Sequence, residues 1–469
     1  MGWVMNRSLS ALLSLVILGA MAACSDLAEV GIITAGSDDD QVQAEVYTPR
    51  APVFTPESIQ SCSKPKSPTF DRSVVTVPAK TEPAVGEVFL DPVFGNCLLR
   101  VTDRGRDLAP DDPSGGMKNE YSRVQSYNAD GTLLLVRSTE ARWYVFDAQN
   151  LVPLRELPIV VDPRWDPEDP LKIYFFDETA LMVYDLALDK TQVIHDFQKD
   201  FPGTNLAAAW MRYEGSPSLN GRYWGLMAQD QDWETVALLV YDQVEDSISA
   251  VREVPSGSEI DSVTISPNGN YLLAYHDETC GPANAEADSQ PCGLMVYDQT
   301  LSEARNLLPV VGHSDIAIGH DGSELLVFQD IPKDEISMLD LETGEVTSLA
   351  SIDFSHSPLG FHFSGRAVDR PGWALVSTYS GARPSATWMD DVVFAIELKS
   401  NGQIVRLAHT QSVVDDGHEK DYWAEPQASV NTDFTRVVFT SNWGKSGTDE
   451  VDMYMIILPE GPSIRSDQP

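Results

Sequence analysis

The stretch that decides the fold is Tyr422–Leu458, which reads YWAEPQASVNTDFTRVVFTSNWGKSGTDEVDMYMIIL. Gln427–Val430 and Arg436–Thr440 have the composition of strands, and Asn431–Asp433 between them is a turn signal. After a polar, glycine-containing break, Met453–Leu458 forms a third strand. Strand, turn, strand, loop and strand make up most of one blade of a β-propeller.

The same pattern recurs along the chain, so the sequence predicts an all-β, seven-bladed β-propeller. The repeated turns are spaced by roughly 40 to 60 residues, the length of a four-stranded blade with variable loops. They fall at Asp130, Glu168, Asn220, Asn268, Asp321, Pro371 and Asp433. In the first five segments the third strand ends in VFD, VYD, VYD, VYD and MLD. An aspartate in that place starts a turn toward a fourth strand.

The last segment has no fourth strand of its own, because only a short polar tail follows Leu458. Upstream of the first segment, Asn96–Thr102 (NCLLRVT) has the length and composition of a strand. We expect this strand to complete the last blade, since closure of the ring removes exposed strand edges.

The N-terminus predicts an exported protein. Ala11–Ala20 is an apolar run of signal-peptide length, too short for a comfortable membrane span. Met21–Cys24 (MAAC) follows, and it resembles the lipobox of bacterial lipoproteins. This resemblance implies cleavage before Cys24, a lipid on its sulfur and, with Ser25 next, the outer membrane, on its periplasmic or cell-surface face. The alternative is an ordinary secretory peptide cut after Ala23.

The predicted organisation follows from these features. Residues 1–23 are the signal peptide, 24–72 a lipidated tether and linker, 73–460 the propeller and 461–469 a C-terminal tail. The four cysteines beyond Cys24 predict two disulfides in an exported chain. Cys280 and Cys292 flank a polar insert and are expected to pair, which leaves Cys62 with Cys97. A zinc site is the competing interpretation, but no CxxC spacing supports it.

The net charge argues against polyanionic partners. The chain has 32 basic and 71 acidic residues and a net charge of −39. Such a surface is unsuited to nucleic acid or to anionic membranes, so the expected membrane contact is through the lipid.

Two motifs carry a resemblance to known propellers. Ser266–Gly269 (SPNG) precedes the strand YLLAY, and Asp433 stands shortly before the strand RVVFTS. Both resemble the WD40-like and TolB-type propellers of exported bacterial proteins, over roughly residues 87–460. The resemblance implies the fold and says little about function.

Propellers usually bind ligands at the rim of the central channel, next to the innermost strands. Candidate rim residues are Tyr121, Arg123, Arg164, Arg212, Tyr213, Glu214, His313, His362, Glu425 and Gln427. Trp210 and Tyr213 beside Arg212 and Glu214 suit a sugar ring with a carboxylate, although aromatic residues at a blade junction also serve packing. The competing interpretation is a wet channel whose polar residues bond one another or water.

His313, His362 and Gln427 come from three consecutive segments. This arrangement resembles the oligogalacturonate lyases, propeller enzymes whose metal site uses histidines and a glutamine. The resemblance implies that these three residues are metal ligands and that Arg212 binds the substrate carboxylate. It also departs from the family, which places two histidines next to the glutamine, whereas WAEPQASV contains none. Glu425 would substitute and favour calcium or manganese.

Three hypotheses about function remain open. The first is an envelope lyase or hydrolase for an acidic polysaccharide, with Arg212, Tyr213, His313, His362 and Tyr121 as catalytic residues. Its ligand-binding residues would be Arg123, Arg164, Trp210, Glu214, Glu425 and Gln427. The second is a non-catalytic propeller that binds a protein or a glycan, and the third is a structural envelope component. The lyase hypothesis expects Arg123, Arg164 and Arg212 to form a local positive funnel.

Overall fold

The computed structural model describes residues 70–280, 291–380, 384–414, 419–459 and 461–462. The predicted signal peptide, Cys24, Cys62 and all but the end of the tether lie outside these residues, so the predictions about them remain predictions. Within the described ranges, no helix has the length and apolar character that a membrane crossing requires.

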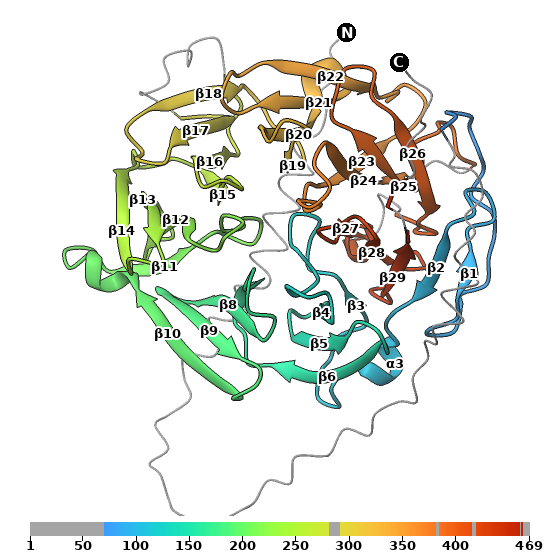
Figure 1. The fold of residues 1–469 in the computed structure, drawn as a ribbon, viewed down its shortest axis with the longest axis horizontal. Coiled ribbons are helices and arrows are strands. Elements are labelled where there is room, and N and C mark those ends of the chain that lie inside the picture. Colours follow the sequence, from blue (N-terminus) through green and yellow to red (C-terminus); the bar gives the residue numbers. More distant parts are fainter. Residues whose placement is uncertain (1–69, 281–290, 381–383, 415–418, 460, 463–469) are drawn as a thin grey trace, which may run out of the picture. The chain divides into compact units, whose positions relative to one another are not determined.

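Seven antiparallel sheets lie around a ring, as the sequence predicts (Figure 1). The innermost strands are β3 (Met117–Lys118), β7 (Val161–Trp165), β11 (Leu206–Trp210), β15 (Ile260–Ile265), β19 (Ser314–Ile318), β23 (Leu359–Ser364) and β27 (Ser429–Val430). The second strands are β4 (Leu133–Ser138), β8 (Lys172–Asp177), β12 (Tyr223–Asp230), β16 (Tyr271–His276), β20 (Glu324–Asp330), β24 (Trp373–Ser380) and β28 (Arg436–Ser441).

The third strands are β5 (Trp143–Asp147), β9 (Ala180–Asp185), β13 (Thr235–Asp242), β17 (Leu294–Asp298), β21 (Glu335–Asp340), β25 (Val392–Glu397) and β29 (Asp452–Ile457). The outer strands of the first six blades are β6 (Val152–Leu157), β10 (Lys190–Asp196), β14 (Ser247–Glu253), β18 (Ala304–Leu308), β22 (Val346–Ser351) and β26 (Ile404–His409). Helical turns are short: α3 (Arg104–Asp107), η1 (Phe197–Asp200), η2 (Ile331–Lys333) and η3 (Glu419–Ala424).

The repeated aspartates do what their position predicts. The third strands of the first five blades each end at the aspartate of the VFD, VYD or MLD signature. In the first blade, Asp147 Oδ1 accepts hydrogen bonds from the backbone nitrogens of Gln149 and Asn150, at 2.8 and 2.7 Å. Asp340 does the same for Thr343 at 2.7 Å. The carboxylate satisfies backbone donors that the turn leaves unpaired, and the chain then reverses into the outer strand.

The sheet of the seventh blade combines both ends of the chain. Strand β2 (Cys97–Arg100) pairs antiparallel with β29, with Cys97 opposite Ile457 and Arg100 opposite Tyr454. Strand β1 (Phe89–Leu90) then forms the outer edge of this sheet. The blade therefore holds segments together that are more than three hundred residues apart in the chain (Figure 1).

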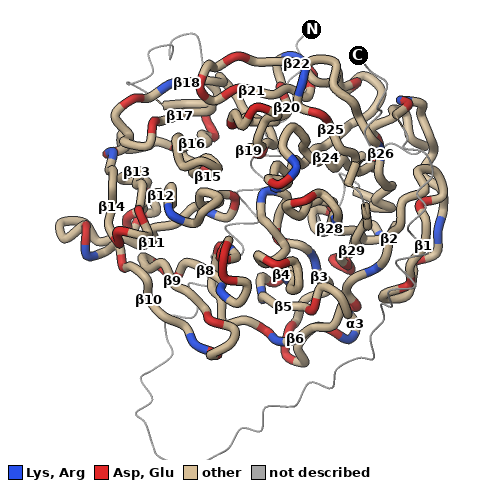
Figure 2. The backbone as a smooth tube through the Cα atoms, in the orientation of Figure 1, with Lys and Arg blue, Asp and Glu red and all other residues tan. Residues whose placement is uncertain are grey.

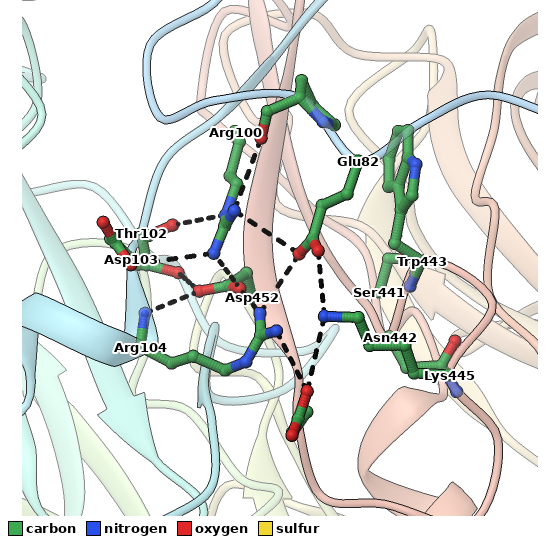
Figure 3. Close-up of polar contacts among 12 residues, drawn as sticks. Glu82, Arg100, Thr102, Asp103, Arg104, Ser441, Asn442, Trp443, Lys445 and Asp452 are labelled. Carbon is green, nitrogen blue, oxygen red and sulfur yellow. Dashed lines mark hydrogen bonds and ion pairs between the residues drawn. The ribbon is translucent and has the colours of Figure 1, made fainter.

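A buried carboxylate lies at this junction (Figure 3). The side chain of Asp452 is 0% exposed and accepts hydrogen bonds from Arg100 Nη2 at 2.6 Å and Thr102 Oγ1 at 2.9 Å. Arg104 adds its backbone nitrogen at 3.0 Å and a contact from its guanidinium. Because every partner of Asp452 comes from residues 100–104, this network ties β29 to the N-terminal segment.

The predicted disulfide between Cys280 and Cys292 is confirmed, with 5.1 Å between the two Cα atoms. It joins the ends of the connection between β16 and β17, whose residues 281–290 lie outside the described ranges. Cys97 is also disulfide-bonded. Its predicted partner, Cys62, is among the residues that the structure does not describe.

Candidate functional site

Charged residues of both signs occur in the segments near the middle of the ring (Figure 2). The segment that follows β3 enters this region, since Arg123 of the first blade reaches β19 of the fifth blade. Several candidate residues that are far apart in the sequence therefore meet here.

Arg123 holds four blades together. Its Nε donates to the carbonyl oxygen of Ser314, and its guanidinium lies 4.7 Å from the ring centre of Tyr275 in the fourth blade. Its Nη1 is 2.9 Å from Glu214 Oε2 after β11, an ion pair without hydrogen-bond alignment. Arg123 is 5% exposed, so its charge is used inside the protein rather than offered to a ligand.

A second group of side chains connects the first and seventh blades. Lys118 Nζ donates to Gln427 Oε1 at 2.8 Å and to the carbonyl oxygen of Glu120 at 2.7 Å. The amide of Gln427 also bonds the carboxyl of Glu425 and the hydroxyl of Tyr422. Gln427 is 1% exposed and has a φ of 43°, a left-handed conformation that is uncommon for a residue other than glycine.

Burial moves two pKa values in this group toward neutrality. Desolvation raises the pKa of Glu425 to about 7, although hydrogen bonds from Tyr379 and Gln427 and the charge of Lys118 favour the ionised form. Desolvation also lowers the pKa of Lys118 to about 7, helped by the nearby Arg137 and opposed by Glu120 and Glu425. An acid and a base that both titrate near pH 7 can exchange protons without a large driving force.

The two predicted histidines lie next to this group. Their ring centres are 4.6 Å apart, and His313 Nδ1 shares a hydrogen bond of 3.0 Å with the hydroxyl of Tyr121. His362 Nε2 is 3.4 Å from Glu425 Oε2, and neither ring nitrogen of His362 has a hydrogen-bond partner. Burial lowers the pKa of His313 to about 4 and that of His362 well below its usual value, so both rings are neutral at pH 7. Burial raises the pKa of Tyr121 well above 10, which makes its hydroxyl a poor base.

The other predicted site residues have structural partners. Arg164 is 3% exposed and donates to the backbone oxygens of Gly215, Pro163 and Tyr213. Trp210 donates its indole N–H to Gln229 Oε1 at 2.7 Å and packs edge-on against Tyr213. These contacts account for Arg164 and Trp210 as parts of the blade packing.

The expected arginine funnel is thus reduced to one residue. Arg123 and Arg164 are buried, whereas Arg212 is half-buried and donates from Nη1 to the carbonyl oxygen of Ile260 at 2.7 Å. The carboxyl of Asp261 lies close enough to interact with the Arg212 charge, and burial raises the pKa of Asp261. The three arginines therefore form no positive funnel, and this observation weighs against the lyase hypothesis.

Sequence reasoning missed Lys118, Tyr379 and Trp423. The signal for Lys118 was a lysine inside the short innermost strand, in the stretch GMKNEY, where a solvent-exposed cation is not expected. Tyr379 and Trp423 are half-buried next to the group, with Tyr379 5.7 Å from His362 and Trp423 under the guanidinium of Arg137. No local pattern distinguishes these two aromatic residues from ordinary packing residues.

A change of pH should reveal the buried carboxyl of Glu425. Below pH 4.5 this group is protonated in both the folded and the unfolded chain, so its burial is not opposed by charge. As the pH rises through about 7 the folded protein must ionise it in a desolvated place, and this part of the stability is lost. We expect Glu425→Gln, which cannot ionise, to be more stable than the wild type at about pH 8.5 by on the order of 1–3 kcal/mol, and to show little gain at about pH 4.5.

Urea unfolding curves at the two pH values measure this difference. The titration of Lys118 has the opposite sign, since its lowered pKa makes stability rise toward alkaline pH, and the charge of Glu425 itself raises the Lys118 pKa. The two proteins are therefore compared in a Lys118→Met background, where this contribution is absent from both. An equal stability difference at both pH values would show that Glu425 does not titrate between them.

Comparisons with known proteins support the fold. The structure matches an oligogalacturonate lyase in complex with manganese at a TM-score of 0.55 and 15% identity, over 80% of this chain and 96% of that one. It matches an oligogalacturonate lyase from Vibrio parahaemolyticus at 0.54 and 14%, over 80% and 97%. No family model and no curated protein matches the sequence. At these identities the likeness establishes a shared seven-bladed propeller and leaves activity to the site itself.

One of the two similar structures, the first oligogalacturonate lyase, holds manganese, but two of the predicted metal ligands of this chain have other partners. Gln427 Oε1 is occupied by the Lys118 ammonium and His313 Nδ1 by the Tyr121 hydroxyl. His362, beside Glu425, has two buried ring nitrogens without a hydrogen-bond partner. Over the described residues, no three His, Cys, Asp or Glu side chains are grouped to hold a metal ion. The donor set of this chain therefore does not fit a metal in the manner that the resemblance implies.

Proposed function

We propose that this protein acts on an acidic saccharide at the centre of its propeller, by proton transfer in the manner of a polysaccharide lyase. One observation carries the proposal: Glu425 is held between Gln427 and His362 with a pKa near 7, next to a half-buried rim of tyrosines. The propeller that the chain shares with oligogalacturonate lyases supports a saccharide as the substrate class.

Elimination in a uronate requires two proton transfers. A base takes the proton from the carbon next to the carboxylate, the bond from the ring to the leaving sugar oxygen breaks, and a carbon–carbon double bond forms. The leaving oxygen then takes up a proton. Glu425 fits both steps, because at pH 7 its ionised and protonated forms are similarly populated. The side chain of Glu425 is 12% exposed, so one edge of its carboxyl can meet a ligand.

The remaining residues would bind and orient the sugar. Tyr121, Tyr213 and Tyr422 are half-buried around the centre and offer aromatic faces. Arg212 is the half-buried cation that could pair with the carboxylate of the substrate. His362 is neutral and in van der Waals reach of Glu425, so it can position that carboxyl without competing for its charge.

Gln427 is not free to bind calcium or manganese in this mechanism, because its side-chain oxygen is bonded to Lys118. The experiment is to incubate the protein with a panel of uronate oligosaccharides, with and without a chelator, and to follow the absorbance of unsaturated products. Product that forms equally with the chelator is the expected result. If the protein formed no unsaturated product and bound no saccharide on the whole panel, the proposal would be ruled out.

The alternative is a propeller that binds a glycan or a protein without reacting with it. The burial of Arg123 and Arg164, at 5% and 3% exposure, favours this alternative, since neither guanidinium can meet the carboxylate of a substrate. Titration calorimetry separates the two functions: saccharide binding that persists without any unsaturated product would support the binder.

We also propose that the protein is exported and anchored by a lipid on Cys24, because the MAAC motif follows an apolar run of signal-peptide length. Replacing Cys24 with alanine is expected to move the protein from the membrane fraction to the soluble periplasmic fraction. Immunoblotting of the two fractions measures this. A variant that stays with the membrane fraction would contradict lipid anchoring.

A further inference from the structure

Lys118 is the only lysine that is buried among the residues that the structure describes, with 2% of its surface exposed. It is the second residue of β3, the innermost strand of the first blade. Burying an ammonium group carries a large desolvation penalty unless oxygen atoms take the place of water. The surroundings of Lys118 should therefore be those of a cation site.

The atoms around Lys118 have that character. The amide oxygen of Gln427 and the backbone oxygen of Glu120 accept from Nζ at 2.8 and 2.7 Å. The carboxyl groups of Glu120 and Glu425 interact with the same ammonium, and the charge of Arg137 opposes it. Amide, carbonyl and carboxylate oxygens are the donor types that a hard divalent cation such as manganese would also use.

We propose that the Lys118 ammonium is the resident cation of the central site and takes the place of a divalent metal. The cation is thus a side chain of the first blade. The amide oxygen of Gln427 binds this ammonium instead of a metal ion. The inference deepens the proposed function, because it concerns the same site, but it does not depend on a saccharide substrate.

The hydrogen bonds give Lys118 a positioning role as well. Lys118 fixes the side-chain oxygen of Gln427. The N–H groups of the same amide must therefore point toward Glu425 and Tyr422. A metal ion or a water bound to the oxygen of Gln427 would keep the amide in the same orientation. Because oxygen atoms surround Lys118, its truncation would leave an oxygen-lined space that a cation from solution could enter.

The experiment is a titration of the full-length protein with manganese chloride, with free Mn²⁺ followed by electron paramagnetic resonance. The wild type is expected to bind no Mn²⁺ at the central site. Lys118→Ala is expected to bind one Mn²⁺ per chain, roughly a hundredfold or more tighter than the wild type, because a like charge has been removed at close range. Lys118→Met is the matched control: it removes the charge, but it fills the space with a side chain of similar length and should bind none.

A second substitution locates the ion. Adding Glu425→Gln to Lys118→Ala should weaken the new Mn²⁺ binding at least tenfold, since a carboxylate ligand is lost. Circular dichroism checks that each variant is folded. Folded Lys118→Ala without Mn²⁺ binding would overturn the proposal.

The wild type provides a test even if Lys118→Ala does not fold. Stoichiometric binding of Mn²⁺ to the wild type that His362→Ala removes would also overturn the proposal, whereas no such binding supports it. Both measurements are made without saccharide. A protein that binds no saccharide would thus refute the proposed function and leave this inference standing, and the reverse also holds.

Discussion

Replacing Glu425 with glutamine is expected to lower the turnover of an acidic oligosaccharide by about 10²–10⁴-fold, the usual contribution of a general acid–base residue. Glutamine preserves the size of the side chain and can still accept a hydrogen bond from Tyr379. It cannot take up or release a proton in the reaction. The rate of unsaturated-product formation across a range of pH measures the effect.

The pH profile separates a chemical role from a structural one. For the wild type, kcat/KM should change with an apparent pKa of about 7, the value that burial imposes on Glu425. In Glu425→Gln this inflection should disappear, whereas a residue that only supports the fold would leave its position unchanged. Glu168→Gln makes the same chemical change in an exposed turn of the second blade and should match the wild type. An inflection near pH 7 that survives in Glu425→Gln would assign the proton transfer to another group.

Replacing Asp452 with alanine is expected to lower the free energy of unfolding by about 3–5 kcal/mol, because it leaves Arg100 and Arg104 beside each other without their buried anion. Denaturant unfolding followed by tryptophan fluorescence measures the loss. Figure 3 shows why the effect should reach the whole ring: the same carboxylate meets the guanidinium groups of both arginines, which belong to the N-terminal segment.

Glu450→Gln is the matched control for Asp452. Glu450 belongs to the same network, 3.2 Å from Arg104 Nη2, but its side chain is 50% exposed, so its removal should change stability by less than about 1 kcal/mol. Deletion of residues 87–103, which removes β1 and β2, should abolish the single cooperative transition of the ring. If Asp452→Ala loses no more than Glu450→Gln, the junction does not depend on this network.

Much of the fold is written in local sequence. Asp147 and Asp340 mark strand ends because each carboxylate bonds backbone nitrogens only two or three residues further on. The number of blades follows from counting a second set of local signals, the seven repeated turns between first and second strands. The pairing of Cys280 with Cys292 is also local, since the two ends of one connection are joined. Interactions over a few residues leave a pattern that can be recognised in a single sequence.

The proximity of several candidate residues was predicted from their positions, and their functional roles stay predictions. His313, His362, Glu425 and Gln427 were singled out because they stand next to innermost strands, and the structure brings them together. The sequence did not indicate that Arg123 and Arg164 would be buried among backbone oxygens. The arginines and the other candidate residues were chosen by their position in the repeat. That position says that a residue is near the channel, but not which way its side chain turns.

The sequence by itself determined the seven blades, the turn chemistry and the group of residues near the axis. Only the tertiary structure decided that Lys118 bonds Gln427, 309 residues away in the chain, and that Glu425 is desolvated enough to titrate near pH 7. The physical reason is that hydrogen-bond partners and dielectric surroundings depend on which blades face one another across the channel. The stretch Tyr422–Leu458 encodes its own strands, but the cation that Gln427 meets is supplied by the first blade.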